Sequence, residues 1–92
     1  MARINVTLMA KKVSENEFFG YITIGKSTIY LKYNTATDKV YLRLDGGKWV
    51  FKASSNDAKL DNNITVKQVI VSRIYKHGDQ VIMAFRLFCD VK

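Results

Sequence analysis

Hydrophobic and polar residues alternate with a period of two along almost the whole chain. This alternation is typical of β-strands, because successive side chains of a strand point to opposite faces of a sheet. Val, Ile, Thr, Tyr and Phe dominate these stretches, and no convincing helical period is found. The pattern predicts about seven strands, over residues 3–12, 18–24, 27–33, 39–44, 48–53, 64–76 and 80–91.

Short turns separate most of the predicted strands. Gly25-Lys26 and Gly46-Gly47 predict two-residue hairpin loops, because glycine readily takes the positive φ that such loops need. A further turn is expected at His77-Gly78, a loop of four or five residues at 34–38, and a longer polar connection at 54–63. We therefore expect one all-β domain over residues 1–92, a small antiparallel barrel or sandwich of OB-like (Greek-key) or meander topology.

The central strands contain two near-copies of one pattern, IYLKY at 29–33 and VYLRL at 40–44. In each copy a tyrosine and a cation lie two residues apart, so both point to the same face of the sheet. The predicted turns place Tyr21 opposite Tyr30, Lys32 opposite Tyr41, and Tyr30 opposite Arg43. The Gly46-Gly47 turn places Leu42 opposite Phe51 and Tyr41 opposite Lys52.

These registers predict two different faces. The inner face collects Ile22, Ile24, Ile29, Leu31, Val40, Leu42, Leu44, Trp49, Phe51 and Ala53. The outer face collects Phe19, Tyr21, Thr23, Thr28, Tyr30, Lys32, Tyr41, Arg43, Val50 and Lys52. A one-residue shift of the strand at 48–53 would move Trp49 to the outer face, because each such shift exchanges the two faces.

The net charge of +7 favours a polyanionic partner. Aromatic rings can stack on nucleobases, and cations between the rings can contact phosphates. The predicted outer face therefore indicates binding of single-stranded DNA or RNA, a chemistry that small basic barrels such as OB-folds and cold-shock domains share. Phe19, Tyr21, Tyr30 and Tyr41 are the candidate stacking residues, and Lys32, Arg43 and Lys52 the candidate phosphate ligands.

A protein interface is the alternative, since tyrosine and arginine are also enriched at interface hot spots. The chain would then be an assembly subunit or a small inhibitor that docks on a partner protein. The last two predicted strands are apolar on both sides, which is typical of strands covered on both sides. We predict a homodimer whose interface includes Val69, Val71, Ile82 and Phe88.

Few residues suit catalysis or metal binding. His77 is the only histidine and lies in a predicted turn, while Cys89 is the only cysteine and lies on an apolar strand face. One His and one Cys do not make a zinc site, and Cys89 has no basic neighbour that would lower its pKa. We expect no enzyme activity, no cofactor and no bound metal. The single cysteine and the lack of a long apolar segment favour a cytoplasmic, reducing location without membrane association.

Overall fold

The computed structural model describes residues 2–92 as an all-β protein, which confirms the expected fold class. Strands account for all its regular elements. They are β1 (Ala2–Lys12), β2 (Glu17–Ile24), β3 (Ser27–Asn34), β4 (Lys39–Leu44), β5 (Val50–Lys52), β6 (Ala58–Lys59), β7 (Ile64–His77) and β8 (Gln80–Val91). Within residues 2–92 there is consequently no helix with the length and apolar character that crossing a bilayer requires.

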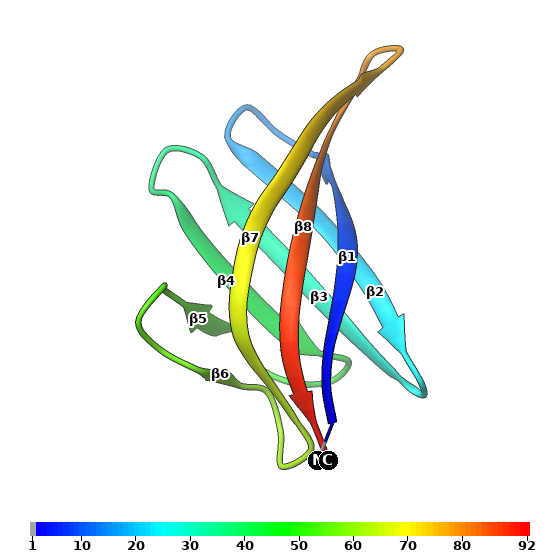
Figure 1. The fold of residues 1–92 in the computed structure, drawn as a ribbon. Coiled ribbons are helices and arrows are strands. Elements are labelled where there is room, and N and C mark those ends of the chain that lie inside the picture. Colours follow the sequence, from blue (N-terminus) through cyan, green and yellow to red (C-terminus); the bar gives the residue numbers. More distant parts are fainter. Residues whose placement is uncertain (1) are drawn as a thin grey trace.

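All eight strands belong to one antiparallel sheet, in the order β5-β4-β3-β2-β1-β8-β7-β6. Each strand is paired with its neighbour in the sequence, apart from β5 and β6, and β1 is also paired with β8. The sheet curls so that its two ends, β5 and β6, lie next to each other and nearly close a barrel (Figure 1). This order is a meander, so of the two expected topologies the Greek-key one is wrong.

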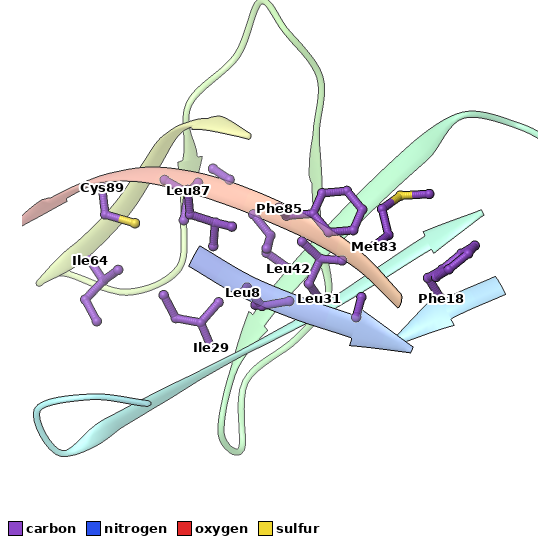
Figure 2. Packing of buried hydrophobic residues seen from close by; sticks show 13 residues of the cluster. Leu8, Phe18, Ile29, Leu31, Leu42, Ile64, Met83, Phe85, Leu87 and Cys89 are labelled. Atoms are coloured by element: carbon purple, nitrogen blue, oxygen red, sulfur yellow. The ribbon is translucent and has the colours of Figure 1, made fainter. Parts of the chain in front are cut away.

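The core lies inside this curled sheet and joins both halves of the chain. Figure 2 shows Phe85 and Leu87 of β8 directed toward Leu8 of β1 and toward Leu31 and Leu42 of β3 and β4. All five side chains are fully buried. Burial of such a side chain contributes about 1.5–3 kcal/mol relative to exposure, so these residues fix which face of each strand points inward.

The predicted registers of the central strands are confirmed. Tyr21 lies opposite Tyr30, and β4 places Arg43 opposite Tyr30 and Tyr41 opposite Lys32. The turns explain this agreement. Gly25 adopts a φ of 61° in a two-residue loop, and Asn34 pairs with Lys39 across a four-residue loop, as the sequence predicts.

The prediction for β5 is wrong by one residue. Leu42 lies opposite Val50 and Tyr41 lies opposite Phe51, because the chain does not return directly after Gly46-Gly47. A turn closes with the Gly47 N–H donating to the Leu44 carbonyl, but strand pairing resumes only at Val50. The longer loop exchanges the faces of β5, so Phe51 points outward and Val50 packs against the core.

Two β-bulges in β7 overturn another prediction. The pairing of β7 with β8 shifts between Val66 and Gln68 and again between Val71 and Arg73. Each extra residue exchanges the faces of the strand that follows it. Val69 and Val71 therefore face inward, opposite Leu87 and Phe85, whereas Ile82 and Phe88 alternate with those buried residues and face outward. The four residues of the predicted dimer interface do not share a face.

The β7–β8 hairpin is longer than the other hairpins and its tip extends past them at the top of Figure 1. Its turn is Gly78-Asp79, with His77 opposite Gln80, one residue later than expected. Near this tip Val71 and Ile74 face inward, but their exposed fractions are 47% and 59%. The core does not reach this end of the hairpin.

Candidate nucleic-acid interface

A continuous group of aromatic and cationic side chains covers the outer face of β2–β5. Strand alternation brings these side chains outward, while the residues between them, including Ile29, Leu31 and Leu42, fill the core. We call this surface the platform. It consists of Phe19, Tyr21, Tyr30, Lys32, Lys39, Tyr41, Arg43, Trp49 and Phe51.

The aromatic rings of the platform contact one another across the strands. The Tyr30 ring centroid is 6.1 Å from that of Phe19 and 5.9 Å from that of Tyr21. Across β4 and β5, the centroids of Tyr41 and Phe51 are 5.5 Å apart. Such pairs stabilise each other by about 0.5–1.5 kcal/mol, so the rings hold defined positions even though they lie at the surface. Tyr21 remains 63% exposed and Phe51 42% exposed, which leaves ring area available to a ligand.

The cations of the platform lie over these rings. The Lys32 ammonium is 4.4 Å from the centroid of the Trp49 ring and 5.3 Å from that of Tyr41. The Arg43 guanidinium is 4.4 Å from the Tyr30 centroid and 5.2 Å from the Trp49 centroid. Cation–π contacts of this kind position a charge beside a flat ring without neutralising that charge.

Trp49 and Phe51 are platform residues that the sequence prediction assigned to the core. Both reach the outer face because of the one-residue shift in β5. Trp49 lies between Lys32 and Arg43, and those two cation–π contacts give a reason for its outward position. The sequence signal that could have located it is the pair of outward cations on β3 and β4, Lys32 and Arg43, which can each lie over an aromatic ring.

Lys52 is the one candidate nucleic-acid-binding residue that lies outside the platform. Its side chain faces inward and is only 6% exposed, so the prediction that it lies on the outer face is wrong. Lys52 lines a groove of about 620 Å³ at the open seam between β5 and β7, together with Val69 and Val71. Its ammonium donates to the Ala53 carbonyl, and burial lowers the pKa of Lys52 below the ordinary value.

The two ion pairs found within residues 2–92 lie outside the platform. Arg3 pairs with Asp90 at 3.0 Å, and Lys67 pairs with Asp57 at 2.6 Å. Lys32, Lys39 and Arg43 therefore keep their charge available. The carboxylate of Glu17 lies at the border of the platform. Glu17 lines a hollow of about 310 Å³ together with Lys32, Lys39 and Tyr41, and accepts a hydrogen bond from Ser14 Oγ.

The residues that suit catalysis lie apart from the platform. Cys89 is fully buried in the core, and burial raises the pKa of its thiol to about 11. His77 is exposed beside the turn of the β7–β8 hairpin. Among residues 2–92, no three His, Cys, Asp or Glu side chains lie close enough together to hold a metal ion.

Comparison of the chain with protein-family models, with curated proteins and with solved structures gives no significant match.

Proposed function

We propose that this protein binds single-stranded nucleic acid through the platform and catalyses no reaction. The observation that supports the proposal is the alternation of exposed rings with unpaired cations on one face of a chain with a charge of +7. A base stacked on an aromatic side chain contributes about 1–3 kcal/mol, and every base has a face that can stack. The binding would therefore depend weakly on sequence.

The charge of the platform predicts how this binding depends on salt. Lys32, Lys39 and Arg43 can each neutralise one phosphate, since none of them is paired with a carboxylate of residues 2–92. For single strands the slope of log K against log salt is about −0.7 per neutralised phosphate, so we expect a slope of about −2. A duplex fits less well, because a curved surface with rings offers no element that enters a groove.

The test is a fluorescence-anisotropy titration of labelled single-stranded DNA and RNA with the wild type and a Tyr30→Ala/Tyr41→Ala variant. The variant keeps the charge but loses two rings, so its affinity should fall at least about 30-fold at constant salt. Ile70→Ala, an exposed aliphatic residue on β7, is the control and should bind as the wild type does. Equal affinities of the wild type and the double variant would refute stacking on the platform.

Protein binding is a second candidate function, and the β7–β8 hairpin is the feature that favours it. Val71 and Ile74 share the inward face near its tip and are 47% and 59% exposed, and exposed apolar patches on soluble proteins often mark interfaces. A second copy of the chain is the simplest partner, since two-fold dimers are the commonest oligomers. Sedimentation equilibrium of the wild type and a Val71→Ser/Ile74→Ser variant would detect such a dimer, which only the wild type should form.

A further inference from the structure

One row of outward-facing residues crosses seven of the eight strands. The register of every neighbouring pair of strands from β7 to β5 places one member of this row directly opposite the next. In order across the sheet, the row consists of Tyr75, Ile82, Lys11, Phe19, Lys32, Tyr41 and Phe51. Neighbouring strands are ~4.8 Å apart, so the row follows the curved sheet for about 29 Å.

The row joins the platform to the β7–β8 hairpin. Arg73-Ile74-Tyr75 on β7 repeats, in reverse order, the tyrosine–aliphatic–cation pattern of Tyr30-Leu31-Lys32 on β3. The cation–π contact of the platform is also repeated, because the Arg73 guanidinium is 5.7 Å from the centroid of the Tyr75 ring. Lys11 lies between the two groups, opposite Phe19 on one side and Ile82 on the other. The outer surface of the hairpin therefore continues the chemistry of the platform.

The outer surface extends much further across the strands than along them. Along β2, the aromatic residues Phe19 and Tyr21 are followed by Thr23, whose hydroxyl lies 3.4 Å from that of Thr28 on β3. At the other end of these strands, Glu17 lies opposite Asn34. On β2 and β3 the aromatic and cationic surface is thus only two outward residues long in the strand direction. An extended ligand that contacts many rings and cations has to cross the strands.

We propose that a single strand of DNA or RNA runs across the β-strands along this row, from Phe51 on β5 to Tyr75 on the β7–β8 hairpin. This inference rests on the proposed function and adds the direction and the extent of the bound strand. Cations alternate with rings in the middle of the row, at Lys11, Phe19, Lys32 and Tyr41. Phosphates and stacked bases of one strand can therefore be contacted in turn. The hairpin lengthens the site, because it carries Tyr75 on its outer face beyond the end of the core. Tyr75 is 37% exposed there.

The proposal predicts an effect that depends on the length of the ligand. The probes are labelled homopolymeric single-stranded oligonucleotides of about 4 to 16 nucleotides, the range of site sizes of single OB-fold barrels. A short oligonucleotide can be held by the platform alone, whereas a long one also reaches the hairpin. Tyr75→Ala should therefore weaken the binding of the longest oligonucleotides about 5- to 150-fold, the effect of losing one stacked base, and leave the shortest ones unchanged.

Lys11→Gln and Ile74→Ala complete this experiment. Lys11→Gln removes a charge from the middle of the row, so it should reduce the salt slope only for oligonucleotides long enough to pass the platform. Ile74→Ala changes an exposed residue on the opposite face of the same hairpin, next to Tyr75 in sequence, and should bind every length as the wild type does. Circular dichroism melting curves identify any variant that has lost its fold.

The outcomes separate this proposal from the proposed function. The row is overturned if Tyr75→Ala and Lys11→Gln bind every length as the wild type does, or if they weaken all lengths equally. In both cases a loss of affinity in Tyr30→Ala/Tyr41→Ala still supports the platform as a binding site. If that double variant also binds as the wild type does, or if the wild type binds no oligonucleotide, both proposals fail.

Discussion

The platform and the tip of the β7–β8 hairpin carry the same pattern on their outer faces but differ in what lies beneath it. Leu31 and Leu42, the inward residues within the two central copies of the pattern, are fully buried. Ile74, the inward residue between Arg73 and Tyr75, is 59% exposed. A strand pattern can therefore present rings and cations without a core below, but only the core and the neighbouring rings fix their positions.

The tyrosine rings of the platform also make more contacts than the tyrosine ring of the hairpin. In the platform, Tyr30 contacts two other rings and one guanidinium. In the hairpin, Tyr75 contacts the Arg73 guanidinium. We expect the platform to be the rigid part of the binding surface and the hairpin tip the adaptable part, because regions with few buried apolar contacts open at low free-energy cost.

The largest expected effect is on stability, and it separates the two regions directly. Leu31→Ala should lower the free energy of unfolding by about 2–5 kcal/mol, because it removes a fully buried side chain and leaves a cavity. Ile74→Ala should change it by less than ~0.5 kcal/mol, as for other exposed positions. Urea denaturation measures both. A loss of more than 1.5 kcal/mol in Ile74→Ala, about the least that burying such a side chain contributes, would mean that the hairpin tip is covered in solution.

The second prediction concerns Lys52, which lies in the seam between the two regions. Lys52→Met should raise the free energy of unfolding by ~1 kcal/mol, because it removes a charge that is poorly solvated in the fold. The lowered pKa also means that the unfolded chain binds this proton more tightly than the folded chain. Wild-type stability should thus gain relative to Lys52→Met as the pH rises from the lowered pKa of Lys52 toward its ordinary value of 10.5.

Denaturation curves of the two proteins at several alkaline pH values test this prediction. Taking the difference between the wild type and Lys52→Met cancels the effect of Cys89, whose raised pKa acts in the opposite direction. If Lys52→Met is the less stable protein at neutral pH, Lys52 stabilises the seam, and the account of a poorly solvated charge is wrong.

The smallest expected effect concerns the phosphate contacts of the platform. Arg43→Gln should reduce the magnitude of the salt slope by about 0.7, because one neutralised phosphate is lost. Lys59→Gln, on β6 and outside the platform, carries the same change of charge and should leave the slope unchanged. Anisotropy titrations over a salt series measure both slopes. Equal changes in the two variants would indicate binding by net charge and not by the platform.

The fold and much of the platform could be predicted from the sequence because short turns fix the pairing of the strands that they join. Gly25 left one possible register for β2 and β3, and with it the position of Tyr21 opposite Tyr30. The alternation of buried Leu31 and Leu42 with outward cations then followed from strand geometry alone.

The errors occur where local sequence does not determine the pairing. Gly46-Gly47 fits a two-residue hairpin, yet the loop continues to Trp49, which cation–π contacts with other strands hold outside. The bulges in β7 are also difficult to predict, because no glycine marks them. Lys67 and Gln68 interrupt the alternation at the first bulge, and the apolar run 69–71 that follows fits either face of the sheet. The pairing of β1 with β8 joins opposite ends of the chain. No short turn connects these two strands, so local sequence does not predict their pairing.

The most direct test of the account uses Trp49, the only tryptophan of the chain, as an internal reporter. Its ring lies between Lys32 and Arg43 in the middle of the platform, so a base that stacks there should quench its fluorescence. We predict that single-stranded oligonucleotides quench the Trp49 emission in a saturable way, with the same affinity as in anisotropy, and that added salt reverses the effect. Binding detected by anisotropy without any change in Trp49 emission would contradict the platform as the site of contact.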